Sequence, residues 1–171
     1  MVVLRRTQKL AGSLPVSDQS AAASETALGD WYVNKHVVHR RPVLLLVSSH
    51  GLLPILTLAR DVANLPKRLP HLVATRLERL AVASNLIEAE LRVMAPVVVA
   101  RTANRSILGV EVDLAKALPL LLEPNGWDES TLPFVESQLG ETPCYAGHRV
   151  NEVVFPNRDV VHLLEERWAA G

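Results

Sequence analysis

Three residues in the middle of the chain are spaced as on one face of a helix, and together they could bind an anion. Arg105, Gly109 and Asp113 stand at positions i, i+4 and i+8. On an α-helix this spacing turns each residue by about 40° around the axis, so the three share one stripe. The glycine leaves a notch between a cation and a carboxylate, and the free N–H groups at a helix start favour anions. The alternative is that Arg105 pins a neighbouring loop while Gly109 admits a crossing strand.

A second polar group stands at the start of a predicted strand. Asp30, Tyr32 and Asn34 would share one face of that strand, with the hydrophobic residues between them on the other face. In one interpretation Asp30 and Asn34 face Arg105 across a cleft. In the other, Asp30 is a turn or cap residue and Trp31 anchors the core. The candidate ligand-binding residues are therefore Asp30, Tyr32, Asn34, Asn104, Arg105, Ser106 and Asp113.

The histidines do not have the spacing of a metal site. His36 and His39 are three residues apart, and on a strand such positions point to opposite faces. The sequence contains no His-Glu-x-x-His string and no pair of cysteines. We therefore expect no metal and no cofactor.

The motifs of nucleophilic catalysis and of nucleotide binding are also missing from the sequence. Ser48, Ser49 and His50 are adjacent, but catalytic triads assemble in space and this triple has no diagnostic frame. There is no Gly-x-Ser-x-Gly, no Walker loop and no Gly-x-Gly-x-x-Gly. Cys144 is interpreted as a packed residue rather than a reactive thiol. The catalytic residues of any enzymatic reaction thus remain unassigned.

Charge and cysteine usage point to a cytoplasmic protein. Eighteen basic residues balance eighteen acidic ones, so no overall field steers the protein onto nucleic acid or an anionic membrane. One cysteine cannot form an internal disulfide, which suits a reducing compartment. The first residues do not form a signal peptide, and no apolar run reaches the roughly 20 residues that span a bilayer. The only argument for nucleic acid is a patch that would form if residues 5–9 lay beside residues 40–41.

The elements that must position these residues follow from hydrophobic periodicity. The pattern predicts an α+β fold, with a small, mainly antiparallel sheet (a meander) packed by four or five helices. Residues 1–171 form one domain, in which residues 11–27 are a loop or poorly structured segment. The expected strands are residues 2–4, 30–38, 43–47, 52–58, 97–99 and 153–155. The expected helices are residues 69–80 with Pro70 in the first turn, 85–95, 107–122 with Asn104 as cap, 129–139, and a terminal helix through Trp168.

Two strings of the sequence resemble the signature of an uncharacterised family of small bacterial proteins, a domain of unknown function. They are Leu28-Gly29-Asp30-Trp31-Tyr32 with Asn34, and Asn104-Arg105-Ser106-Ile107-Leu108-Gly109 with Asp113; Thr7, Lys9 and the pair Arg40-Arg41 also fit. The resemblance implies a bacterial source and a single domain, and it favours a helix after Ser106. It supplies no catalytic residue, substrate or cofactor.

From these observations we expect a cytoplasmic binding or regulatory module with a polar pocket at the strand–helix junction near residues 104–113. Its ligand would be a small anion or a protein partner, with no membrane contact and with self-association permitted by the neutral charge. One alternative is a hydrolase or nuclease acting on phosphoesters with Asp30 or Asp113 as base and Arg105 or His50 stabilising developing negative charge. A further alternative, a component of a toxin–antitoxin pair, rests on size and origin alone.

Overall fold

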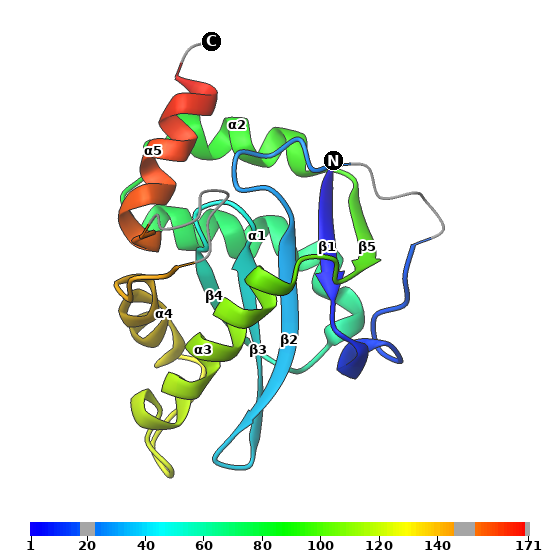
Figure 1. Ribbon diagram of the computed structural model, residues 1–171, viewed down its shortest axis with the longest axis vertical. Coiled ribbons are helices and arrows are strands. Elements are labelled where there is room, and N and C mark those ends of the chain that lie inside the picture. The colour runs from blue at the N-terminus through cyan, green and yellow to red at the C-terminus, as the bar shows by residue number, and fades with distance from the viewer. Residues whose placement is uncertain (18–22, 146–152, 170–171) are drawn as a thin grey trace.

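The computed structural model describes residues 1–17, 23–145 and 153–169. Five strands form one sheet in the order β4-β3-β2-β1-β5 (Figure 1). The strands are β1 (Val2–Arg6), β2 (Trp31–Val38), β3 (Arg41–Ser48), β4 (Pro54–Leu58) and β5 (Val97–Arg101). The α-helices are α1 (Leu65–Arg79), α2 (Ser84–Met94), α3 (Arg105–Leu121), α4 (Leu132–Gly140) and α5 (Pro156–Trp168), and two short 3-10 helices are η1 (Gln8–Leu10) and η2 (Val62–Asn64).

The predicted α+β class and the central meander are confirmed. Strands β2, β3 and β4 pair antiparallel in sequence order, from Trp31 opposite Ser48 to Val47 opposite Pro54. Strand β1 runs parallel to both of its neighbours, with Leu4 opposite Trp31 on β2 and Val99 on β5. The sheet is therefore mainly antiparallel by paired length, with a parallel part at the β1–β5 side.

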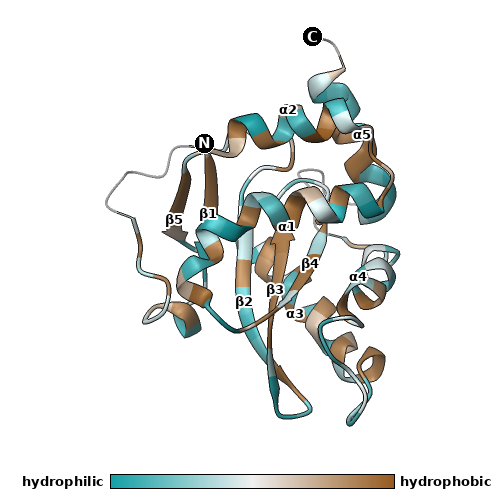
Figure 2. Ribbon diagram, turned by 180° about the vertical axis from the view of Figure 1, so that it is seen from behind, coloured by the Kyte–Doolittle hydropathy of each residue, from teal (hydrophilic) through white to brown (hydrophobic). Residues whose placement is uncertain are grey.

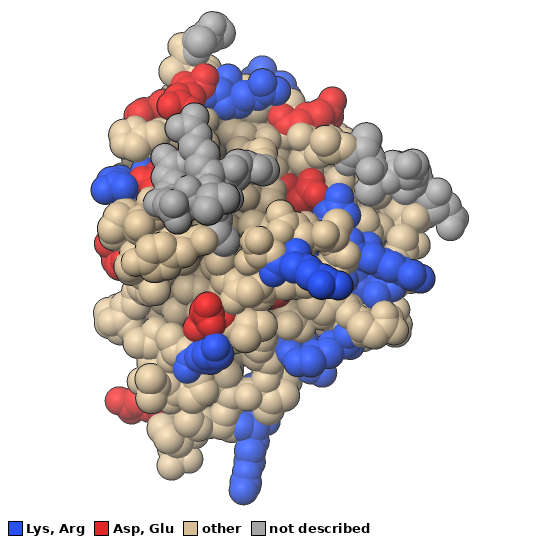
Figure 3. Space-filling model, in the orientation of Figure 1, with Lys and Arg blue, Asp and Glu red and all other residues tan. Residues whose placement is uncertain are grey.

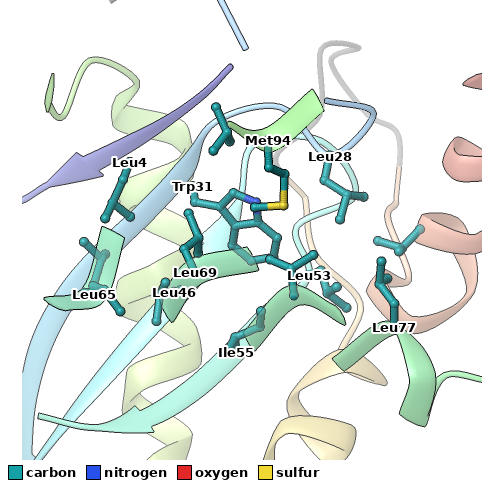
Figure 4. Close-up of a cluster of buried hydrophobic side chains, with 14 of the residues drawn as sticks. Leu4, Leu28, Trp31, Leu46, Leu53, Ile55, Leu65, Leu69, Leu77 and Met94 are labelled. Carbon is teal, nitrogen blue, oxygen red and sulfur yellow. The ribbon is translucent and has the colours of Figure 1, made fainter. Parts of the chain in front are cut away.

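Helices cover both faces of the sheet and create two apolar layers. Helices α1, α2 and α5 pack on one face, where Trp31 lies at the centre of a cluster that includes Leu4, Leu46, Leu69 and Met94 (Figure 4). Helices α3 and α4 pack on the other face. Seen from behind, α1 crosses the sheet, and β1, β3 and β5 are hydrophobic along most of their length (Figure 2). Such strands are buried on both faces, which explains their unbroken apolar runs.

Three predicted elements are wrong in detail. Helix α1 begins at Leu65, so Pro70 lies inside the helix and not in its first turn. Helix α4 begins at Leu132, three residues after the predicted start at Glu129. The predicted strand at residues 153–155 is reduced to an isolated bridge between Val154 and Cys144. Each error is at a short or proline-containing segment, where tertiary packing outweighs local pattern.

The described parts of the predicted loop, residues 11–17 and 23–27, contain turns and bends without a helix or strand. The buried carboxylate of Glu90 on α2 accepts from the backbone N–H groups of Ala27 and Leu28 and from the indole of Trp168 on α5. The end of this segment is thereby fixed against two helices. Within the described residues, no helix is both long enough and apolar enough to cross a membrane.

Candidate functional site

Helix α3 lies along β2 and runs in the same direction (Figure 1). At its start, the hydroxyl of Tyr32 interacts with the peptide groups of Ala103 and Asn104. Near its end, the His39 imidazole lies 3.0 Å from the carbonyl oxygen of Pro119. The strand from Tyr32 to His39 rises about 23 Å, and the helix from Asn104 to Pro119 rises about 22 Å. The helix and the strand therefore cover the same length, and positions at equal distances from their starts lie at the same level.

The predicted helix start is confirmed. Asn104 is the N-cap of α3, and its side-chain oxygen accepts from the backbone N–H of Ser106 at 2.9 Å. Such a cap satisfies one of the free N–H groups at the helix start. Arg105, the next residue, is exposed. Within the described part of the chain its guanidinium has no hydrogen bond or ion pair, so it pins no described loop.

Asp30 is paired with Arg5, not with Arg105. The guanidinium of Arg5 donates to one carboxylate oxygen of Asp30, and the hydroxyl of Ser24 donates to the other at 2.6 Å. The backbone N–H of Asp30 donates to the hydroxyl of Ser49. The interpretation in which Asp30 faces Arg105 across a cleft is therefore not supported.

Tyr32 and Asn34 share the α3 face of β2, but both are largely buried. Burial raises the pKa of the Tyr32 hydroxyl above its usual value. The Asn34 side-chain oxygen accepts from the Thr7 hydroxyl at 2.8 Å and from the Lys35 N–H at 2.9 Å. These two predicted site residues thus hold β1, η1 and α3 against the sheet.

The exposed side of α3 does border a cavity of about 340 Å³, which we call the outer pocket. Gly109 and Asp113 of the predicted stripe line it from the helix, together with Ser106. Opposite them stand residues 142–145, which follow α4. A Cβ atom added at Gly109 would meet nothing within 4 Å, so no described segment crosses the notch.

The electrostatics of the outer pocket differ from the expected anion site. Asp113 is exposed and forms an ion pair with Lys116 at 2.8 Å on the helix surface. Arg105 is not among the lining residues. Cys144 lies in the wall, and burial raises the pKa of its thiol to about 11, so the thiol stays protonated at neutral pH. The interpretation of Cys144 as a packed residue fits this environment.

A second cavity, which we call the inner pocket, lies on the opposite side of α3, between the helix, β2 and η1. It has a volume of about 560 Å³. The side chains that line it are Lys9, Lys35, His36, Val37, Val38, Ala115 and Pro119. Among these only lysine and histidine can carry charge.

Glu111 lies one helical turn before Ala115, rotated by about 40° toward the sheet. Its side chain is fully buried, and neither carboxylate oxygen has a hydrogen-bond partner among the described residues. Burial raises the pKa of this carboxyl to about 8, while Lys9 acts in the opposite direction. The buried Nε2 atom of His36 also has no partner, and burial lowers the pKa of its imidazole with a further contribution from Lys9.

Glu111 is not among the residues singled out from the sequence, where His36 appears only in the context of a metal site. The available signal was the position of Glu111 within the apolar stripe of α3, between Ile107 and Leu114, both of which are buried. A carboxylate in such a stripe is costly to bury unless it has a partner, and it therefore marks a site.

Several other predicted groups have structural roles. The Ser48 hydroxyl accepts from the Leu53 N–H and donates to the carbonyl of His50, which closes a turn. The His50 ring contacts the carbonyl oxygen of Ala27 at 3.0 Å. Residues 48–50 are therefore part of a turn, and the Ser48 hydroxyl already makes two hydrogen bonds within it. His148 lies outside the described residues.

Most cationic side chains of the predicted basic patch, residues 5–9 and 40–41, make contacts within the protein. Strand β1 does lie beside β2, but Arg5 is held by Asp30. Arg6 is buried and donates to a backbone carbonyl. Arg41 stacks over the ring of Trp127 at 4.4 Å. Three of the five cations on which the predicted nucleic-acid patch depends are therefore engaged within the protein.

Asp30 and Asp113 do not form a carboxylate pair. Asp30 precedes β2 and has both oxygens occupied, whereas Asp113 lies about 13 Å along α3 from Asn104, on the outer pocket. No described group of three or more histidine, cysteine, aspartate or glutamate side chains could hold a metal ion. The arrangement of acids therefore does not favour the phosphoesterase alternative.

The fold and the pockets define a small α+β protein with two cavities flanking one helix. Residues 3–159 match a domain of unknown function, DUF6933, and the chain belongs to this family. The match confirms the family resemblance that the two sequence strings indicated. Comparison with curated proteins and with solved structures found no match.

Proposed function

We propose that this protein is a binding module that holds a small, largely apolar molecule in the outer pocket. The observation that carries the proposal is that Ser106, Gly109 and Asp113 of α3 line one cavity together with residues 142–145. Its volume of about 340 Å³ lies within the range of small-molecule sites, which combine apolar walls with a few polar groups.

The chemistry of the lining indicates the class of ligand. Val110, Leu114, Ala117 and Pro143 supply apolar surface. The carboxylate of Asp113 supplies a negative charge at the rim, and no cationic side chain among the described residues lines the pocket. A ligand with an apolar body and an amine or another hydrogen-bond donor matches this distribution. Its donor would compete with Lys116, whose exposed ion pair with Asp113 contributes little.

The cellular setting belongs to the same proposal. The single cysteine suits a reducing cytoplasm, and its thiol is buried in the pocket wall. The family resemblance supports a bacterial source. A cytoplasmic binding module without an assembled catalytic group is consistent with a regulatory role in which ligand binding changes the surface around residues 142–145.

The test is a binding screen read by protein NMR with uniformly 15N-labelled protein. The probes are small apolar amines, each paired with a neutral analogue of the same shape. We expect the amines to shift backbone signals of residues 106–117 and 142–145. Asp113→Asn should weaken the amines about tenfold and leave the neutral analogues nearly unchanged.

Two further variants separate pocket binding from surface effects. Gly109→Leu should fill the pocket rim and abolish binding, because a side chain built at Gly109 has open space on that side. Val112→Ala is the matched control, since Val112 is exposed on α3 and does not line the pocket. Binding that maps elsewhere, or that survives in Gly109→Leu, would overturn the proposal.

A further inference from the structure

The inner pocket lies where β2 extends beyond its pairing with β1. Strand β1 pairs with β2 only as far as Val33, whose carbonyl accepts from the backbone N–H of Thr7 at 3.2 Å. Beyond that point β2 continues to Val38 beside η1. The Lys35 N–H is taken by the Asn34 side chain. The strand edge therefore borders the inner pocket and not another strand.

The mouth of the inner pocket is positively charged. Lys9 from η1 and Lys35 from β2 are both exposed and both line it. Lys9 also acts electrostatically on His36 and Glu111, so its ammonium group lies within range of both. Figure 3 shows Lys and Arg side chains gathered on the side of α3 that faces β1 and η1. Two cations beside an imidazole, without an acid in the lining, suit an anion.

Two buried polar groups, His36 in the pocket lining and Glu111 one helical turn before Ala115, have no hydrogen-bond partner among the described residues. From the matched rise of α3 and β2, Glu111 lies about 10 Å along the helix from Asn104, which is the level of residues 34–36 on β2. His36 lines the pocket, while its Nε2 atom is buried without a partner. A protonated imidazole would donate through this Nε2–H, and an oxygen of Glu111 could accept. Neither buried group is otherwise satisfied.

We propose that the inner pocket binds a small oxyanion, a phosphate or carboxylate group, between Lys9, Lys35 and His36, and that His36 takes up one proton from solvent as the anion binds. The new N–H bond of the imidazolium donates to Glu111, whose carboxyl keeps its own proton and accepts through its carbonyl oxygen. Binding thus satisfies both buried polar groups. This site is separate from the outer pocket and does not depend on the function proposed there.

The charged groups around His36 give the direction of the pH dependence. Lys9 from η1 opposes a charge on the ring. Lys35 is the neighbouring residue on the strand, and burial raises the pKa of the Glu111 carboxyl on α3 to about 8, which keeps it neutral. Burial and Lys9 keep the pKa of the free imidazole below its usual value. The anion offsets the two lysines, so it binds better at pH 5.5 than at pH 7.5. Acetate keeps its charge over this range and would bind equally at both if it needed only the lysines, whereas phosphate gains negative charge as the pH rises and would then bind better at pH 7.5.

The experiment follows the histidine rings by NMR in protein labelled at histidine. The probes are inorganic phosphate and acetate, with sodium chloride at matched ionic strength as the control. We expect phosphate, acetate or both to move the His36 ring signals toward the imidazolium position in a saturable way, while His71 and His162 stay unchanged. The two probes distinguish a phosphate site from a carboxylate site.

Variants assign the response to the pocket. Lys9→Ala should weaken binding about tenfold or more, and Lys9→Arg should retain most of it. Glu111→Gln keeps an acceptor oxygen and should retain binding, whereas Glu111→Met removes the acceptor and should weaken it. Lys116→Ala, on the exposed side of α3, is the matched control and should bind as the parent does. No saturable shift of His36, or the same shift in Lys9→Ala, would overturn the proposal.

Discussion

The guanidinium of Arg5 donates to the carboxylate of Asp30 and thereby ties β1 to the residue that precedes β2. Both side chains are mostly buried, with 16% and 17% exposed. Strands β1 and β2 are far apart in sequence and pair over only three residues, from Leu4–Trp31 to Arg6–Val33. The ion pair therefore reinforces the shortest ladder in the sheet.

Asp30→Asn is expected to destabilise the protein by about 2 kcal/mol or more, because it leaves the Arg5 guanidinium partly buried without a countercharge. Urea unfolding followed by circular dichroism measures the change. Asp113→Asn is the matched control, because this exposed carboxylate should contribute almost nothing to stability. Equal unfolding midpoints for the two variants would show that the Arg5–Asp30 pair is not structural.

Arg105→Ala and Asp113→Ala are expected to leave the free energy of unfolding within about 0.5 kcal/mol of the parent. Both residues are exposed on α3, and only Asp113 has an ion-pair partner. Differential scanning calorimetry of the two variants provides the check. A loss of several degrees in either Tm would mean that these residues support the fold, which would remove the reason to regard them as binding residues.

Stability is expected to fall as the pH rises from about 4.5 to about 8 through the contribution of Glu111. The carboxyl has an ordinary pKa of 4.5 and a folded-state pKa of about 8. Between these values the unfolded chain releases the proton while the folded chain retains it, so the unfolded state is favoured progressively. Above pH 8 both states are ionised and this contribution levels off.

Glu111→Gln removes the titration and should flatten this part of the stability–pH curve. The free energy of unfolding of the variant, relative to the parent, is therefore expected to increase between pH 5 and pH 8. Chemical denaturation at four or five pH values is sufficient. Parallel curves for parent and variant would show that Glu111 ionises in the folded protein as easily as in the unfolded chain.

Gly109→Ala is expected to raise stability by about 0.5–1 kcal/mol, since alanine is the better helix former and its methyl group meets nothing within 4 Å. Gly140→Ala is the contrasting variant. A Cβ atom there would lie 1.9 Å from the Asn157 side-chain oxygen and 2.8 Å from the Arg76 guanidinium. Thermal melts should move in opposite directions. A destabilising Gly109→Ala would mean that the notch is filled.

The parts of the fold that depend on neighbouring residues could be predicted from the sequence. The β2–β3–β4 meander follows from short turns between apolar runs, and the start of α3 follows from the capping side chain of Asn104. The parallel pairing of β1 with β2 and β5 could not be predicted, because it joins segments separated by long stretches of chain. Periodicity carries no information about which distant strands become neighbours.

The candidate site residues also divide into those predicted from local spacing and those that only the folded chain brings together. Helical spacing alone predicts that Gly109 and Asp113 lie on one side of α3, where both line the outer pocket, whereas Arg105 of the same predicted stripe does not. The inner pocket combines Lys9 from η1, His36 from β2 and Ala115 from α3, so only the folded chain brings these three elements together. Neither interpretation of Asp30 included its partner Arg5, because Arg5 stands on β1 and the sequence does not place that strand in the sheet.

The overhang of β2 beyond β1 also bears on how the protein avoids aggregation. An unpaired strand edge is a template onto which a second chain can add a strand. Here the Asn34 side chain already occupies the Lys35 N–H, and Thr7 occupies the carbonyl of Val33. Lysine charges stand on both sides of the gap. A protein with zero formal net charge has little long-range repulsion between copies, so this local protection of one strand edge helps to keep separate molecules apart in concentrated solution.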